Sequence, residues 1–287
     1  MRPEPVSPSV DWYVTDGMPI VSGMPSVAKF PAVLHSRLRS FLGAGLILLS
    51  LALGVAPQAS AQDQMTVVEL FTSQGCPACP RADKLLGELA GREDILALSF
   101  HVDYWDYYGW ADPFARAVYS QRQKRYLNQR GVPYVYTPQM VVDGRWQASG
   151  NKPAEVLEDI RAAQQEAVGR VTVRLERISD EQIRIRIPET DARYRGEADI
   201  MIVRFDGKHV TEVTRGENRG KTIVNHHVVR LIRPVARWNG EAVDVVVSLQ
   251  ELDGADPAYC AILVQEHGQG RMLGATWVDM RKPATRG

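Results

Sequence analysis

A short apolar strand that leads through a pair of cysteines directly into a helix is the feature that most restricts this fold. Residues 67–71 form an apolar run of strand length, bounded by turn residues. Leu85, Leu86 and Leu89 then recur at helical spacing, and Gly91 is placed to end the helix. A strand followed at once by a helix predicts an α/β domain with a central sheet.

The rest of the first half adds further elements of both kinds. They are a strand at 95–103, a helix at 113–131, a hairpin at 139–149 and a helix at 152–169. Asp143-Gly144 is expected to be the two-residue turn of the hairpin. The predicted order is therefore β-α-β-α-β-β-α, within a domain spanning residues 62–168.

The hydrophobic pattern changes after Gly169. Several segments between residues 171 and 280 alternate apolar and polar side chains with a period of two, and turn residues separate them. This pattern predicts an antiparallel sheet or sandwich over residues 169–287. The fold class expected for the chain is α/β plus all-β, with the boundary near residues 168–170.

Residues 1–61 have the parts of a secretory signal peptide. Arg37 and Arg39 precede an uncharged apolar run at 41–56, and small residues follow as far as Ala61. The run is shorter than the roughly 20 apolar residues of a membrane span. We expect cleavage near Ala61 and a periplasmic or secreted protein without a membrane span; an uncleaved anchor or a buried helix are the alternatives.

Charge and cysteine content restrict the partners. The chain has 34 basic and 34 acidic side chains, so nothing in its net charge favours nucleic acid or an anionic membrane. Its three cysteines are an odd number and do not form a disulfide framework. No cofactor is expected. In an exported protein a cysteine pair can form and keep a disulfide.

Cys76 and Cys79 are the candidate reactive pair. We expect Cys76 to lie at the helix N-terminus, where free N–H groups and the helix dipole favour a thiolate. Cys79 follows three residues later on the same face and can resolve a mixed disulfide formed at Cys76. A static disulfide clip and part of a metal site remain alternatives, although a zinc site normally needs two more ligands.

Further blocks of sequence carry a resemblance to known proteins. The CxxC between strand and helix, with Thr137-Pro138 before the hairpin, resembles the thioredoxin superfamily. The blocks "VVELFTSQGCPACPRAD", "FHVDYWDYYGWADPFA" and "YTPQMVVDG" are similar to an uncharacterised family of secreted bacterial proteins with a thioredoxin-like domain, catalogued as a domain of unknown function. The resemblance implies a cis Thr137-Pro138 bond packed against the cysteines, beside a groove for a substrate chain.

Several other residues are candidates for the site. The resemblance implies that Glu69, on the first strand, is a buried acid that moves protons for the resolving thiol; a hydrogen-bonded structural carboxylate is the alternative. Trp105, Tyr107 and Thr137 are expected to bind substrate, although the aromatic residues could instead pack between the two halves. His101 is expected to be a hydrogen-bonded core residue.

The sequence favours an exported thiol–disulfide oxidoreductase that acts on protein thiols and disulfides. One alternative is a periplasmic Cu(I) chaperone, in which His226 or His227 joins the two thiolates. Another is a binding module that uses a thioredoxin-like fold only as a scaffold. Cys260 is expected to be an inert buried thiol.

Overall fold

The computed structural model describes residues 65–166, 170–189, 196–250 and 258–282. All of them belong to one compact unit within Val55–Gly287. The expected signal peptide lies outside the described residues, and so does most of the expected boundary near 168–170. Among the described residues, no helix is long and apolar enough to cross a membrane.

The elements of the first half follow the predicted order. They are β1 (Thr66–Thr72), α1 (Pro80–Leu89), β2 (Ile95–His101), the short 3₁₀ helix η2 (Asp106–Tyr108), α2 (Ala117–Gln129), β3 (Gln139–Val142), β4 (Trp146–Ser149) and α3 (Pro153–Gln165). The second half has β5 (Arg174–Arg177), β6 (Gln182–Ile187), β7 (Ala198–Glu212), β8 (Thr222–Trp238), β9 (Val243–Ser248), β10 (Tyr259–Glu266) and β11 (Met272–Asp279).

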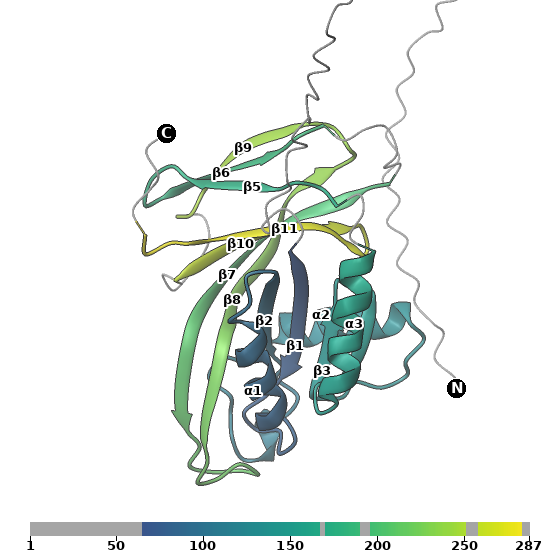
Figure 1. The fold of residues 1–287 in the computed structure, drawn as a ribbon. Helices are drawn as coiled ribbons and strands as arrows, with labels where there is room; N and C mark the ends of the chain where they lie inside the picture. The colour runs from purple at the N-terminus through teal and green to yellow at the C-terminus, as the bar shows by residue number, and fades with distance from the viewer. Residues whose placement is uncertain (1–64, 167–169, 190–195, 251–257, 283–287) are drawn as a thin grey trace, which may run out of the picture. The chain divides into compact units, whose positions relative to one another are not determined.

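Eight strands form one large mixed sheet in the order β11-β10-β7-β8-β2-β1-β3-β4 (Figure 1). β1 runs parallel to β2 and antiparallel to β3. β8 joins the two halves through a parallel pairing of Val228 with Ser99 of β2. The remaining strands form a second, three-stranded antiparallel sheet in the order β5-β6-β9.

The expectation of a separate antiparallel sheet for the second half is therefore wrong in part. β7, β8, β10 and β11 extend the sheet of the first half, and only β5, β6 and β9 form a sheet of their own. The alternating pattern does not predict β8 at its full length, because its many polar residues and Pro234 weaken a strand prediction. Pro234 fits because it lies opposite Met201, where a bulge shifts the register of β7 and β8.

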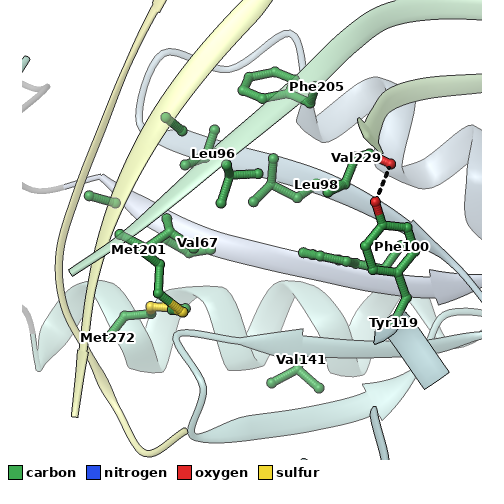
Figure 2. Packing of buried hydrophobic residues seen from close by; sticks show 14 of the residues in the cluster. Val67, Leu96, Leu98, Phe100, Tyr119, Val141, Met201, Phe205, Val229 and Met272 are labelled. Atoms are coloured by element: carbon green, nitrogen blue, oxygen red, sulfur yellow. Dashed lines mark hydrogen bonds between the residues drawn. The ribbon is translucent and has the colours of Figure 1, made fainter. Parts of the chain in front are cut away.

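Alternating side chains place three apolar clusters around the sheets. α1 and α3 cover one face of the first half, with Leu86 and Ile160 in that cluster. α2 covers the opposite face, where Tyr119 donates a hydrogen bond to the Val229 carbonyl at 3.0 Å (Figure 2). The second sheet packs on β7 and β10 through a third cluster that includes Ile185 and Ile262.

The predicted hairpin is present with a longer turn than expected. Val142 pairs with Trp146, so residues 143–145 connect the strands in place of a two-residue turn. Asp143 and Gly144 have positive φ values of 46° and 66°. Asp143 continues the β1 pairing, since its backbone N–H donates to the Val67 carbonyl and its carboxylate accepts from the Val67 N–H, both at 2.8 Å.

Candidate functional site

The two cysteines lie in the loop between β1 and α1. α1 begins only at Pro80, and Cys79 is its N-cap residue. The expectation that Cys76 lies at the helix N-terminus is therefore wrong, because Cys76 is held in a turn before the helix by a 3.1 Å hydrogen bond from its N–H to the Ser73 carbonyl. Pro80 suits the first helical position, where its missing N–H has no helical partner.

Cys76 and Cys79 form a disulfide with a Cα–Cα distance of 5.4 Å. Both residues are 0% exposed. Between them, Pro77 and Ala78 face solvent. The two residues between the cysteines thus reach the surface, whereas the cysteines themselves are shielded from a thiol in solution.

The structure brings three of the predicted site residues together beside this loop. Trp105 donates a 2.8 Å hydrogen bond from its indole N–H to the Thr137 hydroxyl. A Cβ atom added to Gly75 would lie 3.2 Å from the Trp105 Cβ, so Trp105 also packs against the residue before Cys76. The Thr137-Pro138 bond is cis, as the resemblance implies.

Pro138 lies next to the first turn of α1. A Cβ atom added to Gly150 would be 2.6 Å from the Ala82 Cβ and 3.2 Å from the Pro138 Cβ, which places both residues around the same point. The following residue, Asn151, donates a 3.0 Å hydrogen bond to the Ala78 carbonyl. The turn after β4 therefore supports the Cys79 side of the loop.

Exposed aromatic rings extend from this site. Tyr107 and Tyr108 are 75% and 52% exposed, with ring centroids 4.7 Å apart. The Tyr108 ring lies 5.1 Å from that of Trp105, which in turn touches the cysteine loop. The described residues thus place Tyr107 at the exposed end of a row of aromatic side chains that reaches Gly75, next to Cys76. Its role as a substrate contact stays a prediction.

Beneath the loop is a buried polar cluster that sequence reasoning missed in part. Thr72 donates a 2.9 Å hydrogen bond to Asp83, one turn after Cys79 on α1. His101 is paired with Thr72 across the parallel strands, and its Nδ1 lies 2.7 Å from the Asp112 carboxylate. Asp83 Oδ2 and His101 Nε2 are buried and have no hydrogen-bond partner in the structure.

The pKa values of two carboxyl groups in this cluster, those of Asp83 and Asp112, differ from their usual values. Burial raises the pKa of Asp83 to about 7, against the opposing effects of His101 and Thr72. Burial acts in the same direction on Asp112, but His101 and two backbone N–H groups outweigh it and hold the pKa of that carboxyl below its usual range. An acid that titrates near neutrality within one helical turn of Cys79 suits proton exchange with a thiol.

Glu69 does not belong to this cluster. Its carboxylate forms a buried two-point ion pair with Arg122 of α2, at 2.7 Å to Nε and 3.0 Å to Nη2, and it also accepts a hydrogen bond from Tyr126. Because the residues on either side of Glu69, Val68 and Leu70, pack on α1 and α3, Glu69 faces α2. Its expected role in proton transfer stays a prediction.

The contacts of the β8 histidines are with α1 and β2. His226 packs against Gly87 on α1, and His227 Nδ1 lies 2.9 Å from the Ala97 carbonyl. Over the described parts of the chain, no group of three or more His, Cys, Asp or Glu side chains is placed to hold a metal ion. Cys260 is buried in the third cluster, and burial raises its pKa to about 12, as expected of an unreactive thiol.

Two features of the sequence point to Asp83 and Asp112, which were not among the predicted site residues. Asp83 interrupts an otherwise apolar helical face four residues after Cys79. Asp112 lies in the same aromatic block as Trp105, which the resemblance had already singled out. Asn218, described below, had no comparable signal, because it lies in a charged loop far along the chain.

The fold and site define a mixed α/β protein with a sheltered CxxC disulfide between a strand and a helix. Residues 67–265 match the family described as "Protein of unknown function (DUF1223)", and the chain belongs to this family. A solved structure of a protein from Agrobacterium tumefaciens matches with a TM-score of 0.66 and 28% identity, covering 77% of this chain and 97% of that one.

A curated relative is similar over a short segment. A protein of Archaeoglobus fulgidus named "Probable Thioredoxin" is 41% identical over 39 residues. The match covers 14% of this chain and 43% of that protein, so the chain spans less than half of the relative's length.

Proposed function

We propose that this protein carries out thiol–disulfide exchange with exported proteins through Cys76 and Cys79. The observation that carries the proposal is the disulfide itself, together with a buried acid of pKa about 7 one helical turn after Cys79. Trp105, which packs on Gly75 and is hydrogen-bonded to Thr137, supports it. The short similarity to a protein named as a thioredoxin supports the same chemistry. The order of elements in residues 66–165, and the pairing of β1 with β2 and β3, support a thioredoxin-like domain there.

As an oxidant, the protein reacts in two balanced steps. A partner thiolate attacks Sγ of Cys76, a mixed disulfide forms, the Cys76–Cys79 bond breaks, and Cys79 leaves as a thiolate that takes up a proton. A second partner thiolate then attacks the partner's own sulfur and releases Cys76, so two electrons pass from the partner to the protein. The same steps run in reverse when the dithiol reduces a partner disulfide.

Asp83 is the residue we assign to the proton step at Cys79. Its backbone N–H donates to the Cys79 carbonyl at 3.0 Å, so the two residues are held on consecutive turns. With a pKa of about 7, its carboxyl group exists in both protonation states at neutral pH. It can therefore supply a proton to the departing Cys79 thiolate or accept one from the thiol.

The proposed substrate contacts follow from the surface beside the disulfide. Trp105 and Thr137 are linked by a hydrogen bond next to Gly75, and Tyr107 extends the surface outward. Aromatic side chains contribute much of the contact energy in many protein interfaces. We propose that a partner chain lies across this surface while its cysteine reaches Cys76.

Single-cysteine variants test the proposal. Cys76→Ser should lose thiol exchange with a disulfide-containing protein substrate, because the sulfur assigned to form the mixed disulfide is removed and only the resolving thiol of Cys79 remains. Cys79→Ser should instead accumulate a covalent mixed disulfide, visible by non-reducing electrophoresis and mass spectrometry. Cys260→Ala is the matched control and should exchange at the wild-type rate.

The other functions considered would give different results. A Cys76→Ser protein that exchanges at full rate would contradict the proposal. Normal partner binding by a protein with both cysteines changed to serine, without exchange by the wild type, would favour a binding module. Stoichiometric Cu(I) binding that the double change abolishes would favour the copper chaperone.

A further inference from the structure

The loop between β7 and β8 reaches the cysteine loop from the second half of the chain. β7 and β8 form a long hairpin that extends past β10 and β11 and along β2 and α1 (Figure 1). Its connecting loop, residues 213–221, is mostly exposed and includes the charged residues Arg215, Glu217, Arg219 and Lys221. Asn218 is a buried polar residue of this loop, with 0% exposure.

Asn218 is fully engaged by the segment that precedes the disulfide. Its side-chain amide nitrogen donates to the carbonyl oxygens of Gln74 and Cys76, each at 2.8 Å. Its amide oxygen accepts a 2.8 Å hydrogen bond from the Lys221 ammonium group. One side chain thus fixes the carbonyls on both sides of Gly75 and holds the backbone of Cys76 in place.

The same loop is anchored a second time, on the aromatic segment beside the site. Gly216 has φ +70°, and a Cβ atom there would lie 3.0 Å from the Trp110 Cβ and 3.2 Å from the Tyr108 carbonyl. Trp110 in turn donates a 3.2 Å hydrogen bond to the Gln74 side chain. These contacts hold the β7–β8 loop, and Asn218 with it, against the loop that contains the cysteines.

We propose that Asn218 is a latch that keeps Cys76 sheltered, and that its release is the step that admits a partner to the disulfide. The proposal deepens the exchange function proposed above by saying what limits access to it. Both cysteines are 0% exposed, so exchange requires one of them to move. The Cys79 side is fixed by α1 and Asn151. The Cys76 side has its backbone hydrogen bond to the Ser73 carbonyl, and the contact that ties it to the second half of the chain is the side chain of Asn218.

Release of the latch also defines the chemistry of a suitable partner. When Asn218 leaves, the Gln74 carbonyl loses its side-chain donor and the Cys76 carbonyl keeps the Cys79 N–H but loses the Asn218 amide. Buried carbonyls need a hydrogen-bond partner. An extended polypeptide segment can supply its own N–H groups at this position. We therefore infer that the partner is an unfolded or extended chain with free backbone N–H groups around its cysteine.

The rate of disulfide reduction by a small trialkylphosphine tests the latch on the full chain. The phosphine breaks the S–S bond, becomes the phosphine oxide by taking oxygen from water, and leaves two thiols. It needs no protein partner, so the result is independent of whether the protein is an exchange catalyst. Alkylation at timed intervals and mass spectrometry give the rate and the cysteines involved.

Loss of the two hydrogen bonds to the cysteine loop should make Asn218→Ala react about tenfold faster than wild type. Arg219→Ala, a change at the exposed neighbour in the same loop, should react at the wild-type rate. Gly216→Ala should also react faster, because its Cβ would displace the loop from Trp110; it provides the test if Asn218→Ala does not fold.

Cys260 distinguishes local opening from unfolding. It is buried in a different cluster, so it should remain unalkylated while Cys76 and Cys79 are reduced and labelled. Wild-type reduction rates for both Asn218→Ala and Gly216→Ala would overturn the latch, and so would labelling of Cys260 in parallel. Failure of the exchange function would appear separately, as a lack of turnover with a protein disulfide despite rapid phosphine reduction.

Discussion

Asp83→Asn should make the folded protein more stable by about 2–4 kcal/mol at about pH 8 and leave it nearly unchanged at about pH 4. Burial raises the pKa of Asp83 from 3.8 to about 7, so the folded state keeps a proton that the unfolded state has already lost between these values. The wild type therefore loses stability as pH rises through this window, and above pH 7 the full difference remains. Asparagine has no proton to lose, and its amide oxygen can still accept from Thr72.

Urea unfolding of both proteins across this pH range measures the effect. The pKa of Asp83 also depends on four neighbours, so both proteins keep them unchanged: His101, Thr72, Asp112 and Asn225. Asp180→Asn is the control, because its side chain is 92% exposed. A constant difference between Asp83→Asn and wild type at all pH values would contradict a raised pKa for Asp83.

The same variant has a functional consequence. Thiol exchange by the wild type should change with pH around 7, as Asp83 gains or loses its proton, and Asp83→Asn should lack that component. A variant that is more stable but slower at the proton step would mean that the buried carboxyl is retained for chemistry at the expense of stability. An unchanged pH profile would remove Asp83 from the mechanism.

Arg122→Met should lower the free energy of unfolding by about 3–5 kcal/mol, because it leaves the Glu69 carboxylate buried without its cation. Arg122 and Glu69 are 3% and 1% exposed along their side chains. Burial would lower the pKa of Arg122, but Glu69 and Tyr126 outweigh burial and raise that pKa, as expected for a tightly paired cation. Loss of the arginine also removes its hydrogen bonds to Tyr126 and Gln265.

Chemical denaturation of single and double variants tests this account. Arg122→Met combined with Glu69→Gln should recover part of the loss, since no unpaired charge remains. Arg92→Ala breaks an exposed pair with Asp94 and should cost less than about 1 kcal/mol. An Arg122→Met protein as stable as Arg92→Ala would show that the buried pair is not a determinant of stability.

Glu69→Gln alone also decides between the two roles considered for Glu69. If the carboxylate is structural, the variant should be less stable but keep the pH profile of thiol exchange. A changed profile would restore the proton-transfer role that the resemblance implied.

The order of elements in the first half could be predicted because each one is coded locally. The apolar run of β1 and the leucine spacing of α1 are patterns within a few residues. The way the halves combine could not be predicted, because it depends on β8. That strand mixes polar and apolar residues on both faces and meets β2 at a single pair, Ser99 and Val228.

The neighbours of the disulfide in the candidate site could be predicted where they carry a motif, and could not where their proximity depends on folding. Cys76, Thr137 and Trp105 are recognisable from spacing and resemblance, and they lie together in the structure. Glu69 was selected by its position on the strand, but the side of the sheet it faces depends on packing against α2. Asn218 reaches Cys76 from 142 residues away, a distance over which local patterns carry no information.

The reduction potential of the Cys76–Cys79 pair tests the central claim most directly. The protein is equilibrated in glutathione buffers of graded ratio, and free thiols are counted by alkylation and mass spectrometry. We expect reversible exchange with a potential between about −120 and −270 mV, in the range of known thiol-exchange catalysts. A pair that stays oxidised below about −300 mV would be a structural disulfide and would contradict the account.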